Sequence, residues 1–184
     1  MKRLLTVFSL TAAMAFLLAS NCDDGGDTTV DPVEEKMGTL QISYSSNIAK
    51  SGRSDAVWLE TTDSTFVKTV FVSDWIRTGG ALEYSDVINS RWQTSYSGDP
   101  NAVAAATPTA GSQTTTIEIP TDFSPGTYLY MVEIMLMDSV GTNFIAAGEI
   151  EIGSDQSQSS ATLIQDHTGF SDALSNVSAT YTAN

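Results

Sequence analysis

The sequence predicts an all-β fold, an antiparallel β-sandwich that follows a flexible N-terminal tether. Serine and threonine make up 46 of the 184 residues, and helix-forming residues are scarce beyond position 22. Short runs of alternating apolar and polar residues recur along the chain, with turn-forming residues between them. Frequent short strands without helical crossovers are typical of two packed antiparallel sheets.

Six segments have the pattern of strands, and the alternation indicates which of their residues face inward. In the first segment, Leu40, Ile42 and Tyr44 alternate with polar residues, which predicts a half-buried strand. The last segment places its apolar side chains on one face and its two glutamates on the other. The predicted strands are 38–45, 55–61, 66–72, 114–119, 126–137 and 144–152.

A short helix and a C-terminal extension complete the predicted body. Asp99 and Pro100 are typical of a helix N-cap and first turn, which predicts a helix over 100–106. Residues 154–184 are polar and rich in serine and threonine. We expect them to form a loose extension with one or two edge strands, so that the sandwich itself covers 37–153.

The first 21 residues have the build of a secretory signal peptide. Lys2 and Arg3 precede an apolar run, and the small residues Ala19 and Ser20 follow it. The run, at 4–18, is shorter than the roughly 20 apolar residues that a permanent membrane-spanning helix needs. The sequence therefore predicts that the chain is exported and that this segment is removed.

Cys22, the only cysteine, stands directly after the signal segment. The stretch Leu18-Ala19-Ser20-Asn21-Cys22 resembles the lipobox of bacterial lipoproteins. The resemblance implies that the Cys22 thiol is diacylated and that its new amino group is acylated, with chains such as palmitate. Two or three acyl chains make a durable membrane anchor. The alternative is ordinary signal cleavage near Ala19 or Ser20, which would leave a free thiol.

The lipid anchor would place the protein in the cell envelope, with the membrane as its first partner. The periplasmic side of the inner or outer membrane and the cell surface are all compatible with it. Asp23, the residue after the cysteine, resembles the inner-membrane retention signal of enteric lipoproteins. The choice of membrane and the oligomeric state stay open at this point.

The chain is strongly acidic, with a formal charge of −14 that becomes −16 once Lys2 and Arg3 leave with the signal. Such a surface repels the phosphate backbone, which argues against nucleic acid as a partner. Residues 22–36 carry six carboxylates and few apolar side chains, so they are predicted to form an extended acidic linker. No lysine or arginine follows Arg91. Either the surface is simply acidic and soluble, or early strands lie beside late ones, where their positive groups relieve the repulsion.

Three blocks of residues in the body carry a family pattern. The first block comprises 57–60, 66–70 and Trp75, and the second comprises 101–112. The third comprises 125–128, 132–133 and 148–150. On these blocks the body, over roughly 37–153, resembles a family of predicted periplasmic proteins called domain of unknown function 2271. That family is similar in pattern to the immunoglobulin-like domain of the flagellar hook scaffolding protein. The resemblance implies an immunoglobulin-like sandwich, and it implies no specific activity.

The candidate binding residues are Trp75, Trp92 and Glu133. Together with Trp58, the two tryptophans lie within 35 positions, and the three rings are candidates for a sugar-stacking platform, although tryptophans more often fill cores. Glu133 lies in the middle of a strand among methionines, where a carboxylate is costly unless it is paired or protonated. Either its face is the solvent face, or a base such as Lys68 pairs with it, or it has a function.

The other residue types favour neither a catalytic nor a metal site. His167, the only histidine, lies in the polar extension with no nucleophile motif beside it. We therefore predict no metal, no cofactor and no enzymatic activity, and a lipoprotein whose sandwich binds a protein or another component of the envelope. The alternatives are a carbohydrate- or metal-binding accessory module that uses Trp75 and Trp92 or the carboxylates, and, least favoured, a hydrolase centred on Glu133.

Overall fold

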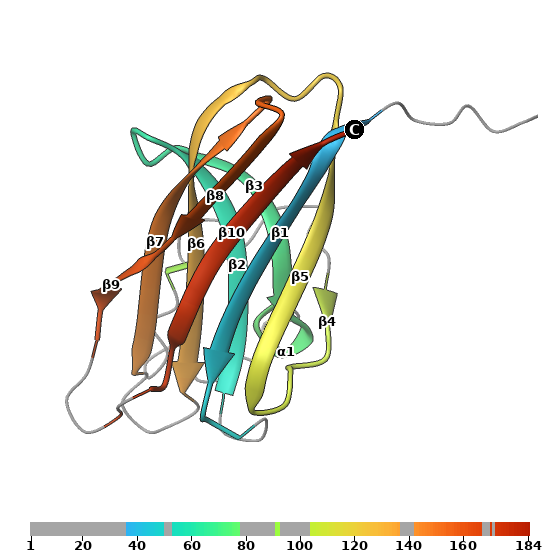
Figure 1. Ribbon diagram of the computed structural model, residues 1–184. Helices are drawn as coiled ribbons and strands as arrows, with labels where there is room; N and C mark the ends of the chain where they lie inside the picture. Colours follow the sequence, from blue (N-terminus) through green and yellow to red (C-terminus); the bar gives the residue numbers. More distant parts are fainter. Residues whose placement is uncertain are drawn as a thin grey trace, which may run out of the picture. The chain divides into compact units, whose positions relative to one another are not determined.

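The computed structural model describes residues 36–49, 53–77, 91–92, 104–136, 142–166, 170 and 172–184. These residues form two facing β-sheets and the single-turn helix α1 (Asp74–Arg77) (Figure 1). In hydrogen-bonded order, the four-stranded sheet contains β5 (Gly111–Pro120), β1 (Lys36–Ser46), β10 (Ser175–Ala183) and β8 (Gln156–Ser160). The six-stranded sheet contains β4 (Ala104–Ala105), β3 (Phe66–Ser73), β2 (Arg53–Thr61), β6 (Gly126–Leu136), β7 (Asn143–Ile152) and β9 (Thr162–Gln165).

The predicted sandwich is confirmed, and its strand pairing is immunoglobulin-like. β1 pairs with β5 as strands B and E do in that fold, and β6 lies between β2 and β7 as strand F lies between C and G. β10 pairs with the other edge of β1, where the fold has strand A. Early strands thus lie beside late ones, as one of the two alternatives predicted, and Lys36 at the start of β1 forms an ion pair with Glu118 on β5.

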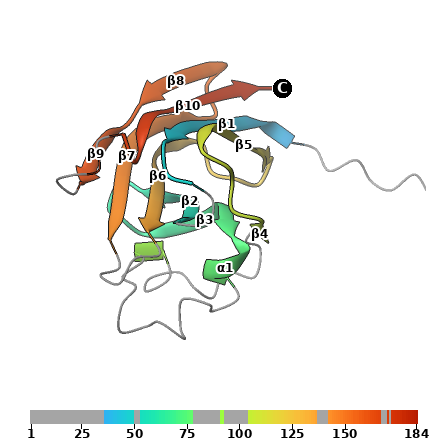
Figure 2. The ribbon, with the colours of Figure 1, turned by 90° about the horizontal axis from the view of Figure 1, so that it is seen from below.

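The main apolar core fills the space between the two sheets, which Figure 2 shows as two layers. β1 contributes Leu40, Ile42 and Tyr44, which alternate with outward polar residues as predicted. β7 alternates in the same way in its second half, with Glu149 and Glu151 exposed. Burial of each large apolar side chain contributes roughly 1.5–3 kcal/mol, so this core is the main source of stability.

The structure corrects two predictions about the C-terminal half. Ala104 and Ala105, which fall in the expected helix over 100–106, form β4 at the edge of the six-stranded sheet, and 100–103 lie outside the described residues. The polar extension is also an integral part of the sandwich, because β10 lies between β1 and β8. The sandwich therefore continues to the C terminus instead of ending at 153.

The N-terminal end of the sandwich lies beside its C-terminal end. The backbone N–H of Asn184 donates to the carbonyl oxygen of Met37 (3.2 Å), and its Nδ2 donates to that of Lys36 (2.6 Å). The signal segment, Cys22 and the linker before Lys36 lie outside the described residues. Within the residues that the structure describes, no helix is long and apolar enough to cross a membrane.

Candidate functional site

The six-stranded sheet is covered on both of its faces. On the face away from the four-stranded sheet, where Figure 2 shows α1, the sheet carries a second and smaller apolar cluster, to which α1 contributes Ile76 and the segment 91–92 contributes Trp92. This arrangement explains why β2 and β6 have buried residues on both sides. The buried members of the cluster are Ala56, Trp58, Val72, Ile76, Trp92, Met131, Met135 and Ile145.

Glu133 on β6 holds the segment 91–92 against the sheet. Its Oε1 accepts a hydrogen bond from the backbone N–H of Arg91 (2.8 Å), and its Oε2 accepts one from the backbone N–H of Trp92 (3.0 Å). Asn143 on the adjacent strand β7 donates from Nδ2 to Oε1 (2.9 Å). The Glu133 side chain has no exposed surface, so the expectation that it lies on a solvent face is wrong.

A second buried carboxyl group, that of Glu60 on β2, binds the same segment. Arg91 donates from Nη2 to both carboxyl oxygens of Glu60, at 3.0 Å each. Trp58 lies on the same face of β2 and donates its Nε1–H to Glu60 Oε1 (2.8 Å). The two glutamates therefore fix Arg91 through its side chain and its backbone, while 34% of the Arg91 side chain stays open to solvent.

Two of the three tryptophans fill a core, which was the alternative to a sugar-stacking platform. Trp58 is fully buried, and Trp92 is 1% exposed and donates its Nε1–H to Thr69 Oγ1 (3.0 Å). Neither ring offers a face to a sugar. Trp75 lies in α1, and its side chain is outside what the structure describes. Trp92 and Glu133 do lie together, but as hydrogen-bonded neighbours in a buried layer, where neither side chain is exposed to a ligand at the surface.

Another group of ionisable side chains lies in the main core. Tyr44 on β1 donates its hydroxyl to Asp55 Oδ2 on β2 (2.8 Å) and so connects the two sheets. Arg53 Nε lies 3.0 Å from Asp55 Oδ1, and neither side chain has exposed surface. This contact is an ion pair without the alignment of a hydrogen bond. The backbone N–H of Asp55 donates to Ser73 Oγ (2.9 Å), which adds β3 to the group.

Arg53 also holds two connecting segments in place. Its Nη1 donates to the carbonyl oxygen of Ile48 (3.0 Å), and its Nη2 donates to that of Thr109 (3.2 Å). Burial raises the pKa of Asp55 to about 6, because the loss of water outweighs the Arg53 charge and the Tyr44 hydrogen bond, which both lower it. Burial, followed by the neighbouring Asp55 charge, also raises the pKa of the Tyr44 hydroxyl above its ordinary value.

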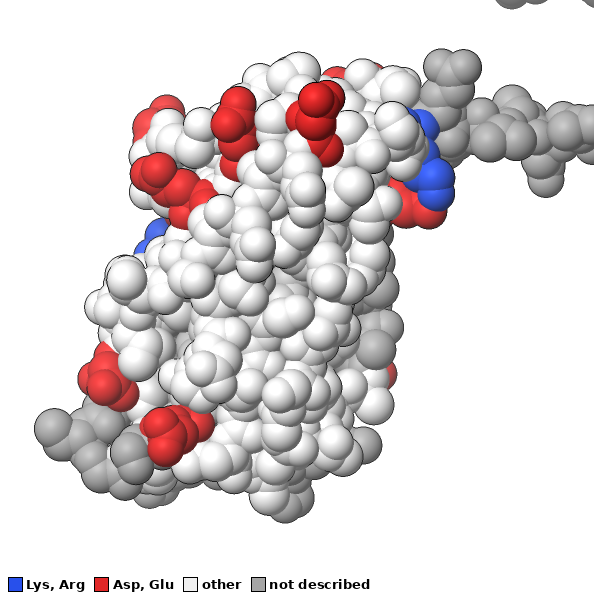
Figure 3. All heavy atoms as spheres, viewed as in Figure 1, with Lys and Arg blue, Asp and Glu red and all other residues white. Residues whose placement is uncertain are grey.

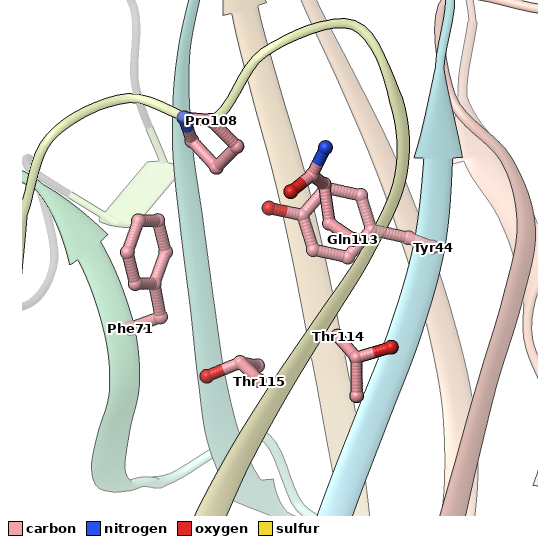
Figure 4. Close-up of a pocket in the computed structure, with 6 residues that line it drawn as sticks. All are labelled: Tyr44, Phe71, Pro108, Gln113, Thr114 and Thr115. Atoms are coloured by element: carbon pink, nitrogen blue, oxygen red, sulfur yellow. The ribbon is translucent and has the colours of Figure 1, made fainter.

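A shallow pocket of about 90 Å³ opens beside this group, between β5 of one sheet and β3 of the other. Figure 4 shows the Phe71 and Pro108 rings facing Gln113 and Tyr44 across the pocket, with the Thr115 hydroxyl directed toward Phe71. None of the lining side chains carries a formal charge. The lining residues are Tyr44, Phe71, Pro108, Gln113, Thr114 and Thr115.

Neither this pocket nor the ion pair beside it was predicted from the sequence. The signal for the pair was the spacing of Arg53 and Asp55, because residues two apart in a strand lie on one face. The pocket has no comparable signal. Its side chains come from β1, β3, β5 and the segment before β5, and only the pairing of the strands brings them together.

Neither metal ligands nor similarity to known proteins indicates a function for these sites. Among the described residues, no group of three or more histidine, cysteine, aspartate or glutamate side chains is placed to hold a metal ion. No protein-family model, no curated protein and no solved structure matches the chain. The resemblance to domain of unknown function 2271 stays a prediction.

Proposed function

We propose that this chain is an exported, lipid-anchored β-sandwich that serves as a non-catalytic binding module of the cell envelope. Support for the anchor comes from the predicted signal peptide and from the position of Cys22 directly after it. Support for a non-catalytic role comes from the buried carboxyl groups. Glu60 and Glu133 are enclosed and engaged with the segment 91–92, which is a structural task.

The observation that carries the proposal is the outer face of the four-stranded sheet. Because side chains alternate along a strand, every second residue of its strands points away from the core. The outward residues of β5, β1, β10 and β8 are Ser112, Thr114, Thr116, Glu118, Thr39, Gln41, Ser43, Ser45, Ser178, Thr180, Thr182, Gln156, Gln158 and Ser160. We call this surface the neutral face, since Glu118 at its margin is paired with Lys36.

A surface without free charges is unexpected in so acidic a chain. Figure 3 shows the neutral face as a broad area of uncharged side chains, with carboxylates gathered toward its two ends. Solvated faces normally carry interspersed charges. Covering hydroxyl and amide groups costs less desolvation free energy than covering carboxylates. The neutral face is therefore well suited to be covered by a partner.

The linker would join the sandwich at an acidic end. Lys36 pairs with Pro120, and Gly126 pairs with Ile152, so the turns after β5 and β7 lie at the end where β1 begins (Figure 1). Carboxylates in and near the turns of this end are Asp63, Asp122, Glu149, Glu151 and Asp155. Anionic lipid headgroups would repel them, which would hold the sandwich off the membrane and leave the neutral face accessible.

The anchor is tested by a Cys22→Ser variant expressed in a bacterium that processes lipoproteins. We expect the unchanged chain in the membrane fraction, released by detergent and not by high salt. The variant should move to the soluble fraction, because it lacks the thiol that the acyl chains require. Equal membrane retention of both chains would contradict the lipid anchor.

The binding face is tested with the soluble Cys22→Ser chain and isolated cell envelopes. Changing Gln41 and Gln158 to glutamate keeps the size of both side chains and adds two charges to the neutral face. We expect this double change to reduce co-sedimentation with envelopes at least fivefold. Thr62→Glu in the exposed β2–β3 turn is the control and should sediment as the parent does. Equal binding of the double variant would contradict a role for the neutral face.

A further inference from the structure

We infer that the neutral face and the pocket beside it bind an uncharged, hydroxyl-rich polysaccharide. This inference rests on the proposed function and names the ligand class. The first observation is the order of the polar groups. Thr116, Gln41, Thr180 and Gln158 lie opposite one another across four strands. Strands lie about 4.8 Å apart, and outward residues of one strand lie about 6.8 Å apart, so the neutral face is a regular array of hydroxyl and amide groups.

Part of this array is held in place by hydrogen bonds between strands. Ser43 Oγ lies 3.0 Å from Thr114 Oγ1, and Ser45 Oγ lies 3.1 Å from Ser112 Oγ. A hydroxyl group has one donor and two acceptor sites, so each pair keeps hydrogen-bonding capacity for a ligand. The hydroxyl groups of sugars are both donors and acceptors, and they match such a surface better than groups that only donate or only accept.

The pocket supplies the apolar contact that the neutral face lacks. It adjoins that face along β5, where Thr114 belongs to both. Phe71 and Pro108 form its apolar wall, and Thr115 and Gln113 lie across from them (Figure 4). Gln113 donates from Nε2 to the carbonyl oxygen of Thr109 (2.7 Å), which fixes its amide and directs Oε1 for use as an acceptor.

These groups suit one sugar residue. The C–H face of a pyranose ring packs against Phe71, and its hydroxyls reach Gln113 and Thr115. The pocket's volume of about 90 Å³ lies well below the roughly 300–1,000 Å³ of pockets that enclose a whole ligand, so the pocket takes one face of a single sugar residue and leaves the rest of the polymer outside. A chain of sugars that continues over Thr114 would then lie on the neutral face.

Charge and residue type select among ligand classes. A chain of formal charge −14 repels an anionic polymer, and the pocket holds no base to offset that repulsion. Protein partners are held mainly by tryptophan, tyrosine and arginine at the centre of an interface. The outward residues of the neutral face include none of these. An uncharged polysaccharide is the remaining class that the array and the pocket both fit.

The test is affinity electrophoresis of the Cys22→Ser chain in native gels that contain laminarin, yeast mannan, arabinogalactan or polygalacturonate. We expect retardation by at least one of the three neutral polymers and none by polygalacturonate. Phe71→Ala should weaken binding at least tenfold. Thr115→Val keeps the shape of the side chain, removes the hydroxyl, and should weaken binding at least threefold. Phe123→Ala, in the turn at the opposite end, is the control and should bind as the parent does.

The outcomes separate this inference from the proposed function. Retardation by a neutral polymer that Phe71→Ala and Thr115→Val both leave unchanged would overturn the role of the pocket. Retardation by polygalacturonate alone, or by no polymer, would overturn the ligand class, while envelope binding that depends on Gln41 and Gln158 would still support the proposed function. Circular dichroism of each variant shows whether a loss of binding reflects the loss of the fold.

Discussion

At the residue scale, Glu133 stabilises a segment that lies far from it in the chain. Its carboxyl group accepts hydrogen bonds from the amides of Arg91 and Trp92, 42 and 41 positions earlier. A buried carboxyl group loses its contact with water, and only such partners offset that loss. The methionines beside Glu133 on β6 pack in the same layer and leave the polar contacts to Glu133 and Glu60.

We predict that Glu133→Gln destabilises the protein by about 3 kcal/mol, because hydrogen bonds to charged groups contribute more than neutral ones and one buried N–H loses its acceptor. Urea unfolding followed by tryptophan fluorescence measures this change, since Trp92 belongs to the affected segment. Glu149→Gln, at an exposed position of β7, is the matched control and should change stability by less than about 0.5 kcal/mol. If Glu133→Gln also lowers the free energy of unfolding by less than about 0.5 kcal/mol, the conclusion that Glu133 holds the segment 91–92 against the sheet is contradicted.

The raised pKa of Asp55 determines how the free energy of unfolding changes with pH. In the unfolded chain this carboxyl group titrates near pH 4, whereas in the folded protein its pKa is about 6. Between these values the folded state binds the proton more tightly, so the free energy of unfolding falls as the pH rises through this window. The shift of about two pH units corresponds to roughly 3 kcal/mol of stability that is present below pH 4 and absent above pH 6.

We therefore predict that Asp55→Asn costs less stability at pH 7 than at pH 4.5, by about 2 kcal/mol, because only the parent loses the favourable protonated state over that range. Urea titrations at four pH values in this range measure the difference. Asp122→Asn in an exposed turn removes the same charge and controls for general acidic repulsion. A penalty for Asp55→Asn that grows with pH would show that the Arg53 charge outweighs burial.

At the element scale, the strands with one buried face were predictable from the sequence. β1 and the second half of β7 alternate between core and solvent, and a period of two is a direct signal. β10 alternates too, but its outward residues are serine and threonine and its inward Ala179 is small. The pattern therefore resembled a polar tail, although the inward face of β10 lies in the core beside β1.

The second apolar cluster, on the outer face of the six-stranded sheet, was not predictable from the sequence for a different reason. Trp58 and Glu60 alternate correctly with the core residues of β2, which placed them on the opposite face. Whether that face meets water depends on α1 and the segment 91–92, and no local pattern shows where those segments pack. The hydrogen bond from Trp92 to Glu133 was equally unpredictable, because a hydrogen bond between a side chain and a distant backbone amide leaves no periodic signal in the sequence.

The integral position of β10 predicts that a chain ending at Gly153 does not fold. Such a chain loses β8, β9 and β10, and with them the hydrogen bonds along one side of β1 and five buried core residues. We expect no cooperative unfolding transition by circular dichroism in urea. A chain of residues 36–184, which removes only the signal and the linker, should keep a cooperative transition. Cooperative unfolding of the shorter chain would show that the sandwich ends at residue 153, as the sequence predicted.

At the scale of the whole molecule, charge separates the surfaces of the sandwich. Carboxylates gather toward the ends, whereas the neutral face along the four-stranded sheet carries hydroxyl and amide groups (Figure 3). The linker is itself acidic and would join one of the acidic ends. Self-repulsion would extend such a linker, and the 14 residues from 22 to 35 would then reach at most about 50 Å. An anchored sandwich would then have its neutral face free to meet polymers of the envelope.

The most direct test of the account is the intact mass of the protein extracted from the membranes of the cells that naturally produce it. We predict a chain that begins at Cys22 and carries a diacylglyceryl group on the thiol and an acyl group on the new amino terminus. The same material should show a circular dichroism spectrum dominated by strands. A full-length chain, or one cleaved near Ala19 or Ser20, with an unmodified Cys22 thiol would contradict the lipid-anchored function proposed here.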